Sequence, residues 1–399
     1  MRSRSRAAFW IEACVMVQTL WTSAAPAMSY AWYARAWHAS NATISAIFAE
    51  YPVVVALTLL ALGGMSDAIG RRSTVLLGRA ASIVGVTAFA VAGSVGALFV
   101  GRLFTGLGVG LAAGPASAAV LDDTPAGDRA FASAINSTAQ ASGLAAAAIV
   151  GGALIEYASD PAHRTFEVLL LLLVVLFVVC WLYLPRGAQF ASTDPGPRAA
   201  RLPSEMRAIL LRAAPSVMTA FVVGTVMLSL GAQIARDLIR SQNMLINGAV
   251  IASFAIVWGV TSLLFKRLPA LAAIRAGGST AAVSMLLLAL AARVHSLPLL
   301  IVSVIAAGIG YALLFMGGLA LVSDRIDHRH RALSLSTLYF AGYAMQAITA
   351  LALGIAASRV GLRDAVTYGA IAIVVACVMT AAGSGAFGTS RSDRGGQAV

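Results

Sequence analysis

Long apolar runs separated by short polar segments make up most of the chain. Between Ile44 and Leu62, for example, the only ionisable side chains are Glu50 and Tyr51. A helix that crosses a bilayer needs about 20 mainly apolar residues, because each residue adds about 1.5 Å along its axis. Twelve segments meet this requirement, at residues 9–31, 43–64, 74–92, 96–119, 131–154, 166–184, 213–234, 245–264, 270–291, 297–321, 333–356 and 364–387. The pattern predicts an all-α integral membrane protein with twelve transmembrane helices.

The composition agrees with this pattern. Of the 399 residues, 59% are hydrophobic and 11% charged, and the mean hydropathy is +0.86. A soluble protein has about 25% charged residues, so this chain has too few charges to cover a surface that faces water. The first apolar stretch follows the basic segment "MRSRSRAAFW". Because many similar stretches follow it, we expect it to be a retained span and not a cleaved signal peptide.

Basic residues are concentrated in every second loop between the predicted spans. With both termini inside, most of the basic residues behind the net charge of +12 fall in cytoplasmic loops, which is the usual bias of membrane proteins. No basic patch is interleaved with aromatic residues, so we expect no nucleic-acid partner. Arginine in place of lysine is typical of a GC-rich genome. We therefore expect a multi-pass protein of a bacterial cytoplasmic (inner) membrane, with the lipid bilayer as its solvent.

A polar segment near the middle of the chain divides the spans into two sets. It contains "RGAQFASTDPGPRAARLP", whose proline, glycine and arginine content suits a linker. The predicted units are a six-helix bundle over 1–186, a cytoplasmic linker over 187–212 and a second six-helix bundle over 213–399. At one constant offset the halves match at Gly106 and Gly308, Gly108 and Gly310, Asp122 and Asp324, and Arg129 and Arg331. Two pseudo-symmetric six-helix bundles are typical of secondary transporters.

Three motifs resemble those of a known family. The loop "GGMSDAIGRRS" (63–73) places Gly63, Asp67, Gly70 and a basic pair at the spacing of the signature loop of the major facilitator superfamily. Arg102-x-x-x-Gly106-x-Gly108 resembles the basic motif of its fourth span, and "DDTPAGDRA" (122–130) resembles the loop that follows. The resemblance covers the whole layout of the chain. It implies a secondary transporter, which works without a cofactor and with a proton gradient as its energy source.

The resemblance also implies a gating latch at the inner end. Asp67 would contact the helix N-terminus near Ala332 when the inner gate is shut, since a helix N-terminus favours an acidic group. Arg71 would bridge toward Asp122 or Asp123, while Gly63 and Gly70 allow close approach and a tight turn. The predicted latch comprises Gly63, Asp67, Gly70, Arg71, Arg72, Asp122 and Asp123. Alternatively, the two arginines only enforce topology. The second half has "FKRLPAL" in the corresponding place, so we expect one latch.

Two ionisable residues lie deep inside predicted spans. Glu50 is about 25 Å along its helix from Asp67, and Arg102 reaches a similar height. An ionised side chain in hydrocarbon costs at least about 2.5–3.5 kcal/mol, so each needs a partner or a watery cavity. Their counterparts in the second half are Ala252 and Val304. We predict that the pair is coupled and that Glu50 carries a proton. A static pair, or a Glu50 that reaches water, remains the alternative. Glu12 is expected at the membrane interface.

Polar and aromatic residues on spans of both halves suggest a mixed, mostly apolar substrate cavity. For any one of them taken alone, packing is the stronger interpretation. The candidates are Gln18, Trp21, Thr225, Tyr311, Tyr339, Tyr343 and Gln346.

The direction of transport rests on weaker features. Exporters that exchange substrate for protons usually carry a Gly-Pro-x-x-Gly-Gly pattern at the end of span 5. Here "GLAAAAIVGG" (143–152) keeps the final glycines but has Ala147 and Ala148 in place of Gly-Pro. We expect proton-coupled efflux of a small amphiphilic molecule by a monomer. Proton-coupled uptake or facilitated diffusion of a metabolite are the alternatives.

Two other classes fit the sequence less well. An intramembrane enzyme needs a nucleophile and base or paired acids within the spans, and Glu50 has no second carboxylate. There is no phosphate-binding loop for ATP and no cluster with metal-ligand spacing. A transporter-like sensor would normally add a soluble signalling domain. The sequence thus favours a secondary transporter over an enzyme.

Overall fold

The computed structural model describes residues 2–124, 128–185, 204–228, 243–323 and 328–383. All regular elements in these ranges are helices, and twelve of them have 20 or more residues. Their bounds are α1 Arg2–Ala36, α2 Asn41–Leu62, α4 Arg71–Ala90, α5 Val95–Asp122, α6 Arg129–Tyr157, α7 Pro161–Tyr183, α8 Ser204–Val226, α10 Met244–Leu264, α11 Ala270–Val294, α12 Leu297–Ser323, α13 His328–Val360 and α14 Leu362–Gly383. The short helix α3 (Met65–Ile69) lies between α2 and α4.

Each predicted segment corresponds to one of the long helices, so the prediction of an all-helical fold is confirmed. Several helices extend beyond the apolar run that predicted them. α8 begins at Ser204, which makes the last part of the predicted linker 187–212 helical, and the end of the predicted segment 213–234 falls outside the described residues. α13 begins at His328, before Ala332. Helices extend in this way because their ends can leave the lipid and use polar residues.

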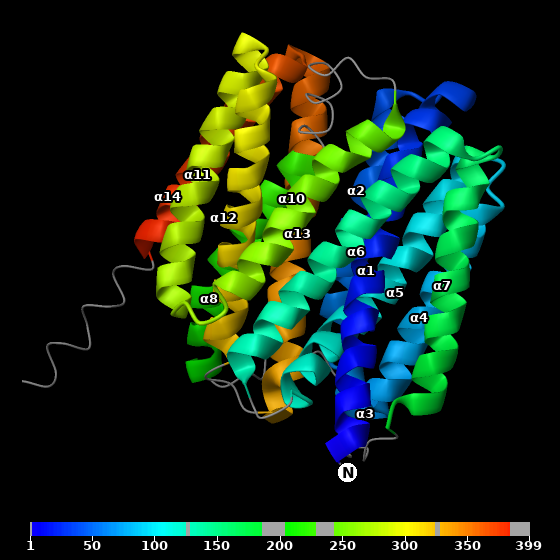
Figure 1. Cartoon of the computed structure of the whole chain (residues 1–399), viewed down its shortest axis with the longest axis vertical. Coiled ribbons are helices and arrows are strands. Elements are labelled where there is room, and N and C mark those ends of the chain that lie inside the picture. Colours follow the sequence, from blue (N-terminus) through cyan, green and yellow to red (C-terminus); the bar gives the residue numbers. More distant parts are fainter. Residues whose placement is uncertain (1, 125–127, 186–203, 229–242, 324–327, 384–399) are drawn as a thin grey trace, which may run out of the picture.

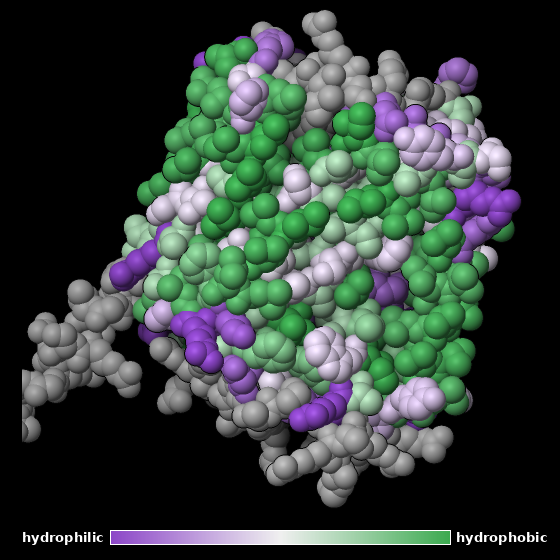
Figure 2. Space-filling view, in the orientation of Figure 1, coloured by the Kyte–Doolittle hydropathy of each residue, from purple (hydrophilic) through white to green (hydrophobic). Residues whose placement is uncertain are grey.

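The surface of the molecule is suited to lipid. Within the described residues, nine helices are long and apolar enough to cross a membrane, and α2 and α14 contain shorter apolar stretches. Large aliphatic side chains such as Leu171, Leu182, Leu211 and Leu264 are more than half exposed. Figure 2 shows hydrophobic residues over most of one face. A soluble monomer rarely exposes apolar patches of this extent, so this is a multi-pass membrane protein.

The helices pack in two groups. The N-terminal group comprises α1, α2 and α4–α7, and the C-terminal group comprises α8 and α10–α14; most packing occurs within a group. Figure 1 shows α4, α5 and α7 on one side of the molecule and α11, α12 and α14 on the other. Between the groups, α6 packs along α10 and α2 packs along α13. We call the end that carries α3 and the starts of α1, α6 and α13 the α3 end.

Glycines permit close helix contact at matching places in the two groups. A Cβ on Gly106 of α5 would lie 2.9 Å from the Cβ of Val54 on α2. A Cβ on Gly308 of α12 would likewise lie 2.9 Å from the Cβ of Val257 on α10. The sequence repeat paired these two glycines. They therefore occupy equivalent packing positions, because both helix pairs approach too closely for any side chain.

Candidate functional site

A buried cavity lies where the two groups of helices meet. Its walls come from α1, α2, α5 and α6 of the N-terminal group and from α8, α10, α12 and α13 of the C-terminal group. It leaves about 60 Å³ for the centres of water-sized spheres, which is enough for several water molecules. A cavity lined by helices of both groups is suited to a ligand that is transported from one side of the membrane to the other.

Aromatic rings form much of the cavity wall. Tyr311 lies 4.3 Å from Trp258 and 5.6 Å from Phe254 between ring centroids. Tyr343 lies 6.1 Å from Tyr51 of the other group. Ring contacts at these distances favour offset or edge-to-face geometry and add to the energy of burial. The wall therefore presents aromatic rings onto which a flat apolar ligand can pack.

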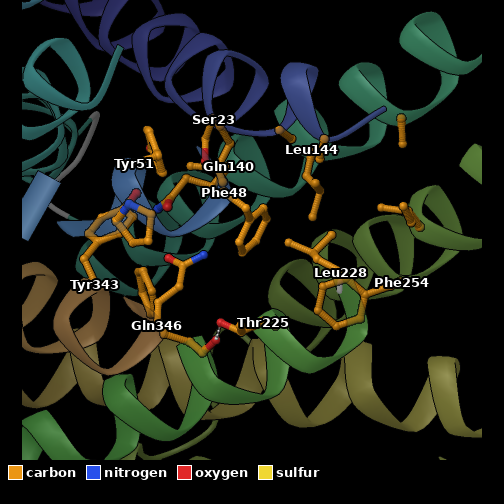
Figure 3. Close-up of a pocket in the computed structure, with 18 of the residues that line it drawn as sticks. Ser23, Phe48, Tyr51, Gln140, Leu144, Thr225, Leu228, Phe254, Tyr343 and Gln346 are labelled. Carbon is orange, nitrogen blue, oxygen red and sulfur yellow. Dashed lines mark hydrogen bonds between the residues drawn. The ribbon is translucent and has the colours of Figure 1, made fainter. Parts of the chain in front are cut away.

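The two ends of the cavity differ in character. Figure 3 shows Leu144, Leu228 and Phe254 on one side, and Tyr51 and Tyr343 on the other. The side chains of Gln140, Thr225 and Gln346 lie between them. The cavity is thus amphiphilic, with a mostly apolar wall and a few polar side chains.

Arg102 of α5 lines this cavity and is 1% exposed. Its Nε donates to the Tyr30 hydroxyl at 2.6 Å, and its Nη1 donates to the Ser23 carbonyl at 3.0 Å. The guanidinium carbon lies 5.3 Å from the ring centroids of both Tyr30 and Tyr51. Among the described lining residues Arg102 is the only charged one. It therefore places a fixed positive charge at the wall.

Glu50 does not line the cavity, although it is next to Tyr51 on α2, which does. Its Oε2 is buried and has no hydrogen-bond partner in the described part of the chain. No ion pair joins it to Arg102 among the described residues. Arg102 instead uses the neutral groups of α1. The predicted coupling of the two residues stays a prediction.

The substrate candidates divide into two sets. Thr225, Tyr311, Tyr343 and Gln346 line the cavity. Gln18, Trp21 and Tyr339 do not. Gln18 contacts Thr22 one turn away on α1, and Trp21 packs against a separate apolar cluster that contains Phe89 and Phe166. The sequence could not separate the sets because it does not define how each helix is rotated about its axis.

Tyr339 instead joins α13 to the N-terminal group. Its hydroxyl accepts from Asn136 Nδ2 at 3.3 Å and from Gln140 Nε2 at 3.2 Å, and it donates to Ser117 Oγ at 3.4 Å. On α10, Trp258 Nε1 donates to Ser137 Oγ at 2.7 Å. We call these residues the polar layer. It lies at the α3 end of the cavity, and two of its members, Gln140 and Trp258, also line the cavity.

Sequence reasoning missed most of the polar layer. The signal was present in "INSTAQ" (135–140), a run of polar residues inside an otherwise apolar predicted span. Polar groups in such a position need partners, and here they find them on α10 and α13. The partners are far away in the sequence, so only their presence, and not their identity, could have been inferred.

The loop after α2 supplies a second set of contacts at the α3 end. Arg71 Nη2 lies 2.6 Å from Asp122 Oδ2. Arg72 contacts the Trp181 carbonyl, and its guanidinium carbon lies 5.5 Å from the Trp181 ring. Gly70 has φ +85°, a conformation that glycine adopts without strain. The Asp67 side chain lies outside the described part of the structure. The role of these residues as a gate stays a prediction.

Asp123 follows Asp122 at the end of α5. Partial burial raises the pKa of the Asp123 carboxyl above its ordinary value; the nearby Arg71 opposes this rise and the Asp122 charge adds to it. The two carboxylates are therefore not equivalent. Asp122 forms the ion pair with Arg71, and Asp123 carries the raised pKa.

The position of Glu12 at the membrane interface stays a prediction, but its side chain is buried. It is 4% exposed, and its Oε2 has no hydrogen-bond partner among the described residues. Because α1 begins at Arg2, Glu12 lies about three turns inside the helix. Arg79 of α4 is also buried, and its Nη2 donates to the Val15 carbonyl at 2.9 Å.

The fold and the cavity define a membrane transporter and not an enzyme. The family model of the Major Facilitator Superfamily matches residues 13–340. The chain belongs to this superfamily. No curated protein sequence matches the chain.

Solved structures with the same fold cover nearly the whole chain. The proton:xylose symporter XylE bound to 6-bromo-6-deoxy-D-glucose has 13% identity, covers 94% of this chain and 95% of its own, and gives a TM-score of 0.76. A partially occluded inward-open XylE from E. coli has 13% identity, coverages of 94% and 97%, and a TM-score of 0.75. The human organic anion transporter MFSD10 (TETRAN) has 15% identity, coverages of 94% and 99%, and a TM-score of 0.72. At these identities the likeness establishes the fold alone.

Proposed function

We propose that the protein moves a small amphiphilic molecule across the bacterial cytoplasmic membrane by alternating access, in exchange for protons. The observation that carries this proposal is the buried amphiphilic cavity lined by helices of both groups. A site at such an interface opens to one side or the other when the groups rock against each other.

The two groups are proposed to act as pseudo-symmetric six-helix bundles over 1–186 and 213–399. The packing supports this division, because α6–α10 and α2–α13 carry most of the contact between them. The equivalent positions of Gly106 and Gly308 support the symmetry. The distribution of basic residues supports a cytoplasmic location for both termini and hence for the α3 end.

We propose further that the inner gate is shut in this structure. The pair Arg71–Asp122 and the bonds of Tyr339 both lie toward the α3 end, below the cavity. Opening this end requires α13 and α10 to leave α6, which breaks the polar layer. The gate thus has two parts: the predicted latch and the polar layer.

Glu50 is the proposed proton carrier. A buried carboxylate oxygen without a partner is costly in hydrocarbon, and a proton relieves that cost. Glu50 lies one residue from Tyr51 at the cavity wall, so movement of α2 changes its access to water. No cofactor is required, and a proton gradient supplies the energy.

Export is the direction we favour, because the cavity wall is more apolar and aromatic than a sugar site needs. Uptake with protons is the second candidate. The fold shared with the proton:xylose symporter supports it. Arg102, which forms no ion pair within the described ranges, could also bind an acidic substrate while Glu50 holds a proton.

Proton movement in everted vesicles distinguishes these directions. A pH-sensitive dye follows the lumen while a chemically broad panel of compounds is added, with Glu50→Gln as the comparison. Proton release from the lumen that is lost in Glu50→Gln supports exchange and the role of Glu50. Release that persists in the variant supports exchange and removes Glu50 from the coupling step. No release across the panel contradicts exchange and favours uptake or facilitated diffusion.

A further inference from the structure

We propose that the cavity selects organic anions: molecules with a carboxylate or similar acidic group bound by Arg102 and an apolar body bound at the opposite end. This inference rests on the proposed function in one respect, that the cavity is the substrate site. It adds the chemical class of the substrate, which neither the fold nor the family defines.

The first argument is charge. Arg102 is the only charged residue among the described lining residues, and it is almost fully buried. A charge in such a place needs compensation. In this structure the guanidinium donates hydrogen bonds to the Tyr30 hydroxyl and the Ser23 carbonyl, and it bonds to no carboxylate among the described residues. Because no ion pair to Arg102 is formed among the described residues, an anionic ligand at the cavity wall could bind its charge directly.

The second argument is the number of donors. A guanidinium has five N–H groups in a fixed plane. Those of Nε and Nη1 bond to Tyr30 and Ser23, while Nη2 has no hydrogen-bond partner in the described part of the chain. Nη2 is thus left to bind a ligand. Carboxylates are bound well by such donors, because charge-assisted bonds are shorter and stronger than neutral ones.

The third argument is that the arginine is already held in position. Two hydrogen bonds and the rings of Tyr30 and Tyr51, each 5.3 Å away, fix its guanidinium before any ligand arrives. A side chain that is already ordered loses little entropy on binding. The arrangement is therefore suited to recognition and not only to packing.

The arrangement of side chains around the cavity indicates what the rest of the ligand is like. Tyr51, which contacts Arg102, lies on one side of the cavity, and Leu144, Leu228 and Phe254 lie on the other (Figure 3). An acidic group at Arg102 thus directs an apolar body toward these three side chains. The Gln346 amide, on the C-terminal group, is available for a further polar contact.

Cationic substrates fit this cavity less well. Its aromatic rings could attract a cation, but no acidic residue is among the described lining residues, and Arg102 repels a second positive charge. Glu50 has its carboxylate outside the lining. The electrostatics therefore favour anions over neutral compounds, and neutral compounds over cations.

Three probes with one ring system test the inference: 2-naphthoate, 2-naphthamide and 2-naphthylmethylamine. Binding to the purified full-length protein is measured by isothermal titration calorimetry. We expect 2-naphthoate to bind roughly ten- to hundredfold more tightly than the amide, as expected for a hydrogen-bonded charge, and the amine to bind most weakly. Arg102→Gln should abolish the preference for the acid, and Arg102→Lys should keep part of it. Arg79→Gln, which removes another buried arginine away from the cavity, should keep all of it.

Several results would overturn the inference: no binding of 2-naphthoate up to its solubility limit, equal or tighter binding of the amide or amine, or a preference that survives Arg102→Gln. If Arg102→Gln fails to fold, the relative affinities of the native protein for the three probes still test the inference. Selective binding of 2-naphthoate without proton movement in proteoliposomes would support the anion site and contradict proton coupling. Proton movement driven only by neutral or cationic compounds would support proton coupling and contradict the anion site.

Discussion

Arg71 and Asp122 form an ion pair in which Nη2 and Oδ2 are 2.6 Å apart, and this pair joins the first turn of α4 to the last turn of α5. Both residues were predicted to belong to a latch, yet the pair lies within the N-terminal group. It therefore does not itself connect the two groups. If the pair affects gating, as predicted, it does so through the position of the loop that carries Asp67.

Arg71→Gln should slow transport more than it lowers stability. The pair is partly exposed, so its contribution to the free energy of unfolding is about 1 kcal/mol or less. Transport rates in vesicles and thermal unfolding in detergent measure the two effects. Asp122→Asn should have the same effect on transport and stability, and the double variant should lower either quantity little further than each single variant does. Arg164→Gln breaks an exposed pair with Glu167 of similar length and is the matched control. An equal loss of rate in that control would remove the special role of Arg71.

Asp67→Asn should slow transport while it leaves folding and membrane insertion intact. The substitution keeps the shape of the side chain but removes the charge that a helix N-terminus would attract. Transport in vesicles, with the amount of inserted protein measured in parallel, tests this. Normal turnover in the variant would rule out the latch.

Asp123→Asn should raise the melting temperature at pH 7. The pKa of Asp123 is raised in the folded protein, so its stabilising contribution is present at low pH and is lost as the pH rises through that pKa. A neutral amide avoids the cost of ionisation at pH 7. The gain should shrink as the pH falls toward that pKa, because more of the native carboxyl is then protonated. Melting curves at pH 7 and at lower pH measure this, and a gain that does not depend on pH would contradict it.

Tyr339→Phe should destabilise the protein by about 1–3 kcal/mol, because it leaves the buried amides of Asn136 and Gln140 with fewer partners. If the polar layer holds the α3 end shut, the variant should also expose cysteines introduced there to thiol reagents. Thermal unfolding and labelling rates measure the two effects. Tyr368→Phe, at an exposed position on α14, is the control. Unchanged labelling would exclude the polar layer from the gate.

Gly152→Ala should disturb the contact between α6 and α10. The added Cβ would lie 2.8 Å from the Met244 carbonyl oxygen, so the helices must move apart at a cost of about 1–3 kcal/mol. We expect a lower melting temperature and slower transport. Gly93→Ala meets nothing within 4 Å and should have little effect. Equal melting temperatures and transport rates in the two variants would show that the protein tolerates a larger distance between α6 and α10.

Much of the fold could be predicted because helices in lipid are determined locally. A backbone in hydrocarbon must satisfy its hydrogen bonds within its own segment, so every long apolar run had to be a helix. The spacing of Gly106 and Gly108, and the charges of the loop at 63–73, identified the family for the same local reason. The boundaries were less accurate where polar residues continue a helix beyond the lipid, as at Arg2, Ser204 and His328.

The site depended on contacts that no local pattern contains. Arg102 was predicted to be a functional residue, but its partners Tyr30 and Ser23 lie on α1, and no ion pair joins it to Glu50 among the described residues. Tyr339 was predicted to line the cavity and instead bonds to α5 and α6. A helix can turn about its axis without any change in its own hydrogen bonds, so the direction of each side chain is determined by packing against helices distant in sequence. The apolar pattern therefore determined which segments cross the membrane, and helix packing determined which side chains meet at the cavity.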